Sequence, residues 1–168
     1  MKEINVSELK DNMFDAIGKE WMLVTAGNSS SFNTMTASWG GVGVLWGKPV
    51  AFIFIRPERY TREFIERENG LTLSFLGEAH RDVHSICGSK SGRDIDKVAA
   101  TGLKPIFTEE GNVTFEQSRM TLECRKLYEQ SISADNFIDK DMVDRWYGEK
   151  GGMHIMYVLE IEHVWVNE

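Results

Sequence analysis

The sequence predicts a mainly β protein in which antiparallel strands form a barrel flanked by a few short helices. Three observations support this fold class. About six or seven segments are rich in β-branched and aromatic residues, which favour strands. The three prolines stand singly at expected element boundaries. Closing the strands on one another also removes exposed strand edges, so a barrel is the economical arrangement.

The first third of the chain is expected to hold one helix and three strands. The helix covers residues 8–20 (ELKDNMFDAIGKE), where Leu9, Met13, Phe14 and Ile17 fall on one stripe and Ser7 can cap the start. The last of the three strands is a continuous apolar run, which predicts burial on both faces. The strands span residues 21–27 (WMLVTAG), 31–41 (SFNTMTASWGG) and 49–55 (PVAFIFI).

The rest of the chain alternates short helices with further strands. A helix of about ten residues is expected to begin with Pro57 in its first turn and to end before Gly70. Two more short helices each end on a glycine, and another lies in the stretch before the last strand. These helices fall in residues 80–88, 92–102 and 134–152, and the strands cover residues 71–77, 112–118, 119–132 and 153–166.

Composition restricts the class of protein. The chain has 168 residues without repeats or linkers, which suits a single domain over residues 1–168. A net charge of −7 disfavours nucleic acid and anionic lipid as partners. The two cysteines lie far apart and suggest neither a disulfide framework nor a zinc ribbon. No signal peptide or membrane span is evident, so we expect a cytoplasmic protein that does not associate with a membrane.

The segment 31–41 surrounds one large indole with small polar side chains. Small residues at Thr36, Ala37 and Ser38 would let a planar ligand lie against the backbone, whose N–H and C=O groups can bind the polar edge of a heteroaromatic ring. Trp39 could then flank that ring. The alternative is a strand with a polar outer face and a buried tryptophan, and this segment alone leaves both open.

Two further segments could bind an anion. Residues 56–63 (RPERYTRE) lie where a strand is expected to end and a helix to begin, and Thr61 together with Arg56 or Arg59 would offer donors to a phosphate. Residues 89–97 (SKSGRDIDK) form a glycine-punctuated loop with three cations in an acidic chain. Both segments are also compatible with solvated charges, paired to neighbouring carboxylates or capping a helix.

The remaining candidate residues do not match the patterns of a metal site or of a catalytic nucleophile. His80, His84 and Cys87 fall on one helical face, but no further ligand pattern accompanies them, so we expect no metal. Residues 135–141 lack the spacing of a calcium loop. We also find no nucleophile motif, so no catalytic side chain is expected.

Taken in order, the motifs N-x-M-T-x-S-W, R-P-x-R-Y-T and S-G-R-D-x-D-K resemble the flavin reductase-like family of FMN-binding split barrels, which includes flavoredoxins and ferric reductases. The resemblance covers about residues 15–165. It implies a split six-stranded antiparallel β-barrel with short flanking helices. It also implies a homodimer in which FMN lies near the subunit interface.

The resemblance further assigns residues to the cofactor. The first motif would line the isoalloxazine and ribityl chain, the next two would hold the phosphate, and a histidine before the last strand would complete the site. These residues are Asn33, Met35, Thr36, Ala37, Ser38 and Trp39, then Arg56, Tyr60, Thr61, Ser91 and Lys97, and finally His154. Residues 129–151 are longer than the connection we expect in relatives, which leaves the substrate side undefined.

The implied function is an oxidoreductase in which FMN receives a hydride from NAD(P)H and passes electrons to a flavin, to iron or to another protein. The cofactor would carry this chemistry while the protein supplies orientation and electrostatics. The alternative is a non-catalytic module of the same fold that keeps a flavin or a haem without turnover.

Overall fold

The computed structural model describes residues 1–167, and they form a large antiparallel sheet and a small one. The large sheet has eight strands: β1 (Lys2–Ile4), β2 (Met22–Asn28), β3 (Ser31–Ala37), β4 (Gly40–Leu45), β5 (Lys48–Ile55), β6 (Gly70–Phe75), β9 (Met120–Ser131) and β10 (Ile155–Val166). The small sheet pairs β7 (Pro105–Phe107) with β8 (Val113–Phe115). The helices are α1 (Met13–Asp15), α2 (Thr61–Arg67), α3 (Arg81–Ser89), α4 (Lys97–Thr101) and α5 (Asp141–Trp146).

The large sheet is a split barrel. Its strand order is β3-β2-β6-β9-β10-β5-β4, with β1 added to β10, so the consecutive strands β3 and β4 stand at opposite ends of the order. The chain turns between them at Gly40, whose φ of 153° and close approach to the Phe52 carbonyl leave no room for a side chain. The mainly β split-barrel prediction is therefore confirmed, with β1 and β4 extending the sheet beyond six strands.

The last strand, β10, pairs with three other strands of the barrel. β10 pairs with β9 along its whole length, while its other edge pairs first with β5 and then with β1. Register shifts after Val158 and after Ile161 interrupt the β9 pairing. Such irregularities bend a strand, which allows one strand to serve two partners on the same edge.

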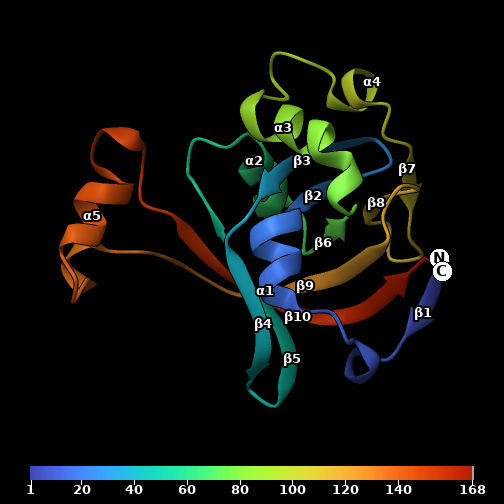
Figure 1. Ribbon diagram of the computed structural model, residues 1–168, viewed down its shortest axis with the longest axis horizontal. Coiled ribbons are helices and arrows are strands. Elements are labelled where there is room, and N and C mark those ends of the chain that lie inside the picture. Colours follow the sequence, from blue (N-terminus) through green and yellow to red (C-terminus); the bar gives the residue numbers. More distant parts are fainter. Residues whose placement is uncertain (168) are drawn as a thin grey trace.

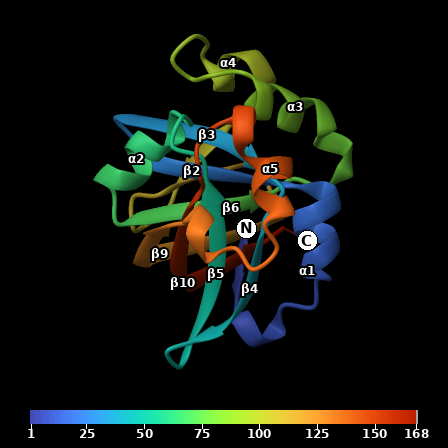
Figure 2. The same ribbon diagram turned by 90° about the vertical axis from the view of Figure 1, so that its left-hand side faces the viewer.

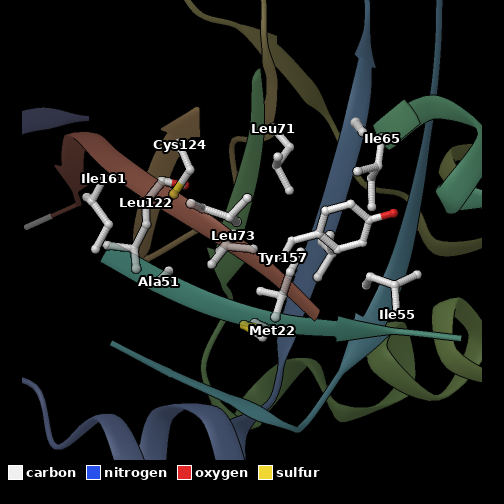
Figure 3. Close-up of a cluster of buried hydrophobic side chains, with 14 of the residues drawn as sticks. Met22, Ala51, Ile55, Ile65, Leu71, Leu73, Leu122, Cys124, Tyr157 and Ile161 are labelled. Atoms are coloured by element: carbon white, nitrogen blue, oxygen red, sulfur yellow. The ribbon is translucent and has the colours of Figure 1, made fainter. Parts of the chain in front are cut away.

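The interior is filled by alternate residues of the strands. Figure 3 shows side chains of β5, β6, β9 and β10 converging, with Ile65 of α2 facing the hydroxyl end of Tyr157. Ala51, Ile53 and Ile55 are fully buried, whereas the intervening Phe52 and Phe54 are only half-buried. The prediction that this strand is buried on both faces is wrong, because an antiparallel sheet can leave its outer face partly exposed.

The N-terminal segment departs from the expected helix. A short 3-10 turn at Val6–Glu8 is capped by Asn5, and the helical stretch begins only after Asn12, whose side chain accepts from the Phe14 amide at 3.2 Å. It then continues as a π-type turn over Ala16–Glu20. The two asparagines thus cap two separate helical turns, so the segment is not one continuous helix from residue 8 and Ser7 is not its cap. Phe14 is 90% exposed, so it does not belong to the core stripe that we expected.

Helices α2, α3 and α4 are short and gather near β3. The helix after Pro57 begins later than predicted, at Thr61, because residues 57–60 form turns closed by Arg59 N–H to Arg56 O and Arg62 N–H to Arg59 O. α3 and α4 confirm the two short helices ending near glycines, and both views show them above β3 (Figures 1 and 2). No helix among residues 1–167 has the length and apolar character needed to cross a membrane.

Residues 132–153 form an arm between β9 and β10. The arm carries α5, projects from the barrel in Figure 1 and faces the viewer in Figure 2. Ile138 on the arm is 99% exposed, while Tyr147 near its end is buried. The arm therefore combines an exposed outer part with a base that packs against the rest of the chain.

Candidate functional site

Two adjoining pockets follow β3 and hold every residue that the sequence assigned to a cofactor site. The inner pocket, of about 180 Å³, is lined by Met35, Thr36, Ala37, Ser38, Trp39, Arg56 and His154, together with Phe54 and Arg59. The middle pocket, of about 130 Å³, is lined by Asn33, Tyr60, Thr61, Ser91 and Lys97, together with Glu58, Arg59, Lys90, Gly92 and residues 88–89. Arg59 is common to both pockets. Their role in binding a flavin stays a prediction.

The inner pocket has a floor of small side chains and an aromatic wall. The Thr36 hydroxyl donates to the His84 carbonyl at 2.7 Å, which attaches the strand to α3. Trp39 is 38% exposed and stands edge-on to Trp146 of the arm, with ring centroids 5.0 Å apart. The alternative of a buried tryptophan is therefore not what the structure shows.

His154 closes the inner pocket beside the base of the arm. Its ring lies 5.2 Å from the Trp39 ring, and its Nδ1 shares a hydrogen bond of 2.9 Å with the Tyr147 hydroxyl. Burial, with a smaller contribution from Arg56, lowers the pKa of His154 to about 4. The histidine is thus neutral at physiological pH and can offer a hydrogen bond without a charge.

Replacing His154 by glutamine is expected to make the protein less sensitive to acid. The folded-state pKa of about 4 lies below the ordinary value of 6.5, so the unfolded chain binds a proton first and folding stability falls as the pH drops through this window. Urea unfolding at pH 7 and at pH 5 would measure the loss of stability, which should be smaller in the variant than in the wild type. An equal loss in both proteins would show that His154 is not held neutral.

The middle pocket is built around a buried lysine. Lys97 Nζ donates to the carbonyls of Thr34 and Cys87 at 2.8 and 2.9 Å, which leaves its third donor uncommitted. Burial lowers the pKa of Lys97 to about 8. Within residues 1–167 no carboxylate forms an ion pair with this buried ammonium, so an anion that enters the pocket would stabilise it.

Hydroxyl and amide groups complete this pocket. Asn33 Nδ2 donates to Thr61 Oγ1 at 2.7 Å, and both residues are buried. Gly92 lies so close that a Cβ there would stand 2.0 Å from Asn33 Oδ1, so the backbone reaches the pocket wall only because this residue is glycine. The single acidic residue lining the pocket, Glu58, accepts from the Gly152 amide. This donor set fits a phosphate group.

The structure separates the two arginines of this segment. The residue pattern left Arg56 and Arg59 open as phosphate donors, and the family resemblance assigned Arg56. Arg59 donates to the carbonyls of Gly88 and Cys87 and lies between the two pockets. Arg56 instead donates to the Trp146 and Gly152 carbonyls at 2.9 and 3.2 Å, and its guanidinium lies 5.3 Å from the Tyr147 ring centre. Arg56 therefore holds the base of the arm and lines only the inner of the two pockets.

Comparison with known proteins identifies the family. Residues 14–168 match the family model described as the flavin reductase like domain. The chain belongs to this family. No match was found among curated proteins.

Solved structures share the fold of this chain. The flavin reductase-like chain superposes on flavoredoxin from Methanosarcina acetivorans with a TM-score of 0.69 and 18% identity, over 89% of this chain and 69% of that chain. For flavoredoxin of Desulfovibrio vulgaris (Miyazaki F) the TM-score is 0.67 at 23% identity, over 88% of this chain and 69% of that chain. For an FMN-binding protein from Thermus thermophilus the TM-score is 0.69 at 20% identity, over 100% of this chain and 83% of that chain.

The sequence left several residues of this flavin reductase-like site unassigned, among them Arg59, Gly92 and Phe54 in the pocket walls and Tyr147 beside His154. Gly92 and Arg59 lie inside the family motifs, so a signal for them existed. Tyr147 lies on the arm, where no motif marks it. On α3, His84 and Cys87 are buried. No group of three or more His, Cys, Asp or Glu side chains that could hold a metal occurs within residues 1–167, and the expectation that this helix binds no metal stays a prediction.

Proposed function

We propose that this flavin reductase-like protein binds FMN across the inner and middle pockets and transfers electrons from NAD(P)H to an acceptor. The observation that carries the proposal is that two pockets with different lining residues meet at Arg59. One has small side chains against an aromatic wall, and the other has a buried lysine with hydroxyl donors. A flat ring linked to a phosphate needs this combination.

Each residue then has a role that follows from its position. Thr36, Ala37 and Ser38 would face the ring system, because their small side chains allow a close approach to the backbone. Lys97, Arg59 and Thr61 would hold the phosphate. Bound FMN would supply the hydride and electron chemistry, and the side chains would orient it and limit access of water.

We also propose a homodimer whose interface covers the open side of the inner pocket. Beside Trp39, an apolar groove of about 370 Å³ runs between α1 and β4 and is lined by Met13, Phe14 and Val42. Phe14 is 90% exposed and Val44 on β4 is 79% exposed. Large exposed apolar side chains gathered beside a pocket are typical of a protein interface.

We further propose that the protein is cytoplasmic. Cys87 and Cys124 are free and buried, which suits the reducing conditions of the cytoplasm.

The proposal is tested by equilibrium titration of the purified protein with FMN, followed by anaerobic mixing with NADH and with NADPH. We expect saturable binding and rapid bleaching of the flavin absorbance by at least one nucleotide. Absence of FMN binding would contradict the proposed function. Flavin that binds but is never reduced would leave the non-catalytic module as the function.

A further inference from the structure

The base of the arm places a tyrosine against the histidine of the inner pocket. Tyr147 and His154 are both buried, with 7% and 6% of their surface exposed. The Tyr147 hydroxyl lies 2.9 Å from His154 Nδ1, and the two rings stand edge to face with their centroids 5.5 Å apart. The arm therefore contacts a residue of the candidate site through one of its ring nitrogens.

Contacts on several sides hold the Tyr147 ring in place. The Phe137 ring stands edge-on to it at 6.1 Å, and the Arg56 guanidinium lies 5.3 Å from its centre. The same guanidinium donates to the carbonyls of Trp146 and Gly152, one on each side of the tyrosine in the chain. Because both the ring and the flanking backbone are held, the hydroxyl has a defined direction.

The position of His154 is also fixed. Its carbonyl accepts from the Ile132 amide at 2.9 Å, which joins the first residue of the arm to the start of the last strand. Its ring lies 5.2 Å from the Trp39 ring. With Nδ1 bound to Tyr147, Nε2 is the nitrogen left for the inner pocket, and no hydrogen bond from elsewhere in residues 1–167 occupies it.

The surroundings of the Tyr147 hydroxyl indicate which of the two groups donates. A neutral imidazole carries one proton, on Nδ1 or on Nε2, and the partner of one nitrogen sets the state of the other. With the proton on Nδ1, the tyrosine oxygen would accept, and its own proton would need a second acceptor. Within residues 1–167, His154 is the only hydrogen-bond partner of this buried hydroxyl. The arrangement without an unsatisfied donor has Tyr147 donating to Nδ1 and the imidazole proton on Nε2.

We propose that Tyr147 is a positioning residue of the inner pocket, whose hydroxyl holds His154 in the tautomer that presents Nε2–H to the bound ring system. A fixed, neutral N–H donor suits an oxygen or nitrogen acceptor at the edge of an isoalloxazine ring. The arm would thereby take part in the site although none of the family motifs lies on it. This inference rests on the proposed function, because the acceptor belongs to the flavin.

The first test observes the tautomer in the protein without flavin. Long-range proton–nitrogen NMR spectra of nitrogen-15-labelled protein at pH 7 show which imidazole nitrogen carries the proton. His154→Gln identifies the signals of His154 among the four histidines. We expect wild-type His154 to be protonated at Nε2 alone. Tyr147→Phe keeps the ring and removes the hydroxyl, so a population protonated at Nδ1 should appear.

Tyr128→Phe is the matched control for this spectrum. Tyr128 is an exposed residue of β9 whose hydroxyl donates to Gln130 Oε1 at 2.7 Å, and it lines neither pocket. Its replacement should leave the His154 signals unchanged. Unchanged signals of the other histidines in Tyr147→Phe would show that this variant is folded.

The second test measures flavin binding by titration. Tyr147→Phe should weaken FMN and riboflavin equally, by about three- to tenfold, which corresponds to one hydrogen bond at the ring. In the His154→Gln background the same replacement should cause no further loss, because the tyrosine acts through the histidine.

Three results would overturn this inference: wild-type His154 protonated at Nδ1, an unchanged tautomer in Tyr147→Phe, or additive losses of binding in the double variant. The tautomer is observed without flavin, so these results leave the proposed function intact as long as the wild type binds FMN. A wild type that binds neither FMN nor riboflavin would contradict the proposed function and this inference together.

Discussion

Replacing Lys97 by methionine is expected to weaken FMN binding by about 100-fold, the equivalent of losing one to two charge-assisted hydrogen bonds. Lys97 is 6% exposed, and two of its three donors already bond carbonyl groups. The third donor and the charge are therefore available to a phosphate. Titration of both proteins with FMN and with riboflavin measures the effect, because riboflavin lacks the phosphate and should bind both equally.

The pH dependence of FMN binding gives the same variant a second test. Burial lowers the pKa of Lys97 to about 8, so the free protein loses this charge as the pH rises through 8. FMN binding must then take up a proton, and its affinity should fall between pH 7 and pH 9.5. Burial lowers the pKa of the Arg59 guanidinium from its ordinary value of 12.5, but arginine keeps its charge in proteins. Burial raises the pKa of the Cys87 thiol to about 11, which lies above this range.

Lys97→Met should remove this decline, while Lys104→Met should retain it. Lys104 is an exposed residue outside the inner and middle pockets, paired at 2.9 Å with Glu116, and serves as the matched control. An unchanged FMN affinity in Lys97→Met, or a loss of riboflavin binding to the same extent, would mean that the lysine supports the fold and does not hold the phosphate.

Arg59→Ala and Arg56→Ala are expected to have different consequences, although both residues belong to one motif. Arg59→Ala should weaken FMN by about 10- to 100-fold, because it removes the guanidinium between the two pockets. Arg56→Ala should instead release the base of the arm, since it loses its contacts with the Trp146 and Gly152 carbonyls and with the Tyr147 ring.

FMN titration and limited proteolysis together separate the two outcomes. Arg56→Ala should be cleaved faster within residues 132–153 than the wild type, and Arg59→Ala should be cleaved at the wild-type rate. The assignment would be reversed if Arg56→Ala weakened FMN binding more than Arg59→Ala and left the arm protected. Riboflavin binding again serves as the control for the folded state.

Local sequence patterns predicted most of the elements because those patterns depend on neighbouring residues. Runs of β-branched and aromatic side chains marked the strands, and glycines marked the ends of α3 and α4. The pattern was less informative where side chains bond the local backbone. Asn5 and Asn12 divide the N-terminal segment, and the turns at residues 57–60 delay α2.

Which side chains of β5 are buried could be decided only from the pairing of the strand in the sheet. A continuous apolar run does not show which residues face the core, whereas pairing with β10 and β4 places Ile53 and Ile55 inside and Phe54 in the inner pocket. The pocket is thus lined by a side chain that the sequence assigned to the interior.

The sequence by itself determined the fold class, the family motifs and the residues that gather at the candidate site, because each depends on residue types at short spacing. Only the tertiary structure decided which of those residues line the inner pocket, which line the middle pocket and which hold the arm. The contacts of Asn33 with Thr61, of Lys97 with Thr34 and of Arg56 with Trp146 join residues 28, 63 and 90 positions apart. Such contacts arise from strand register and helix packing, which no local pattern encodes.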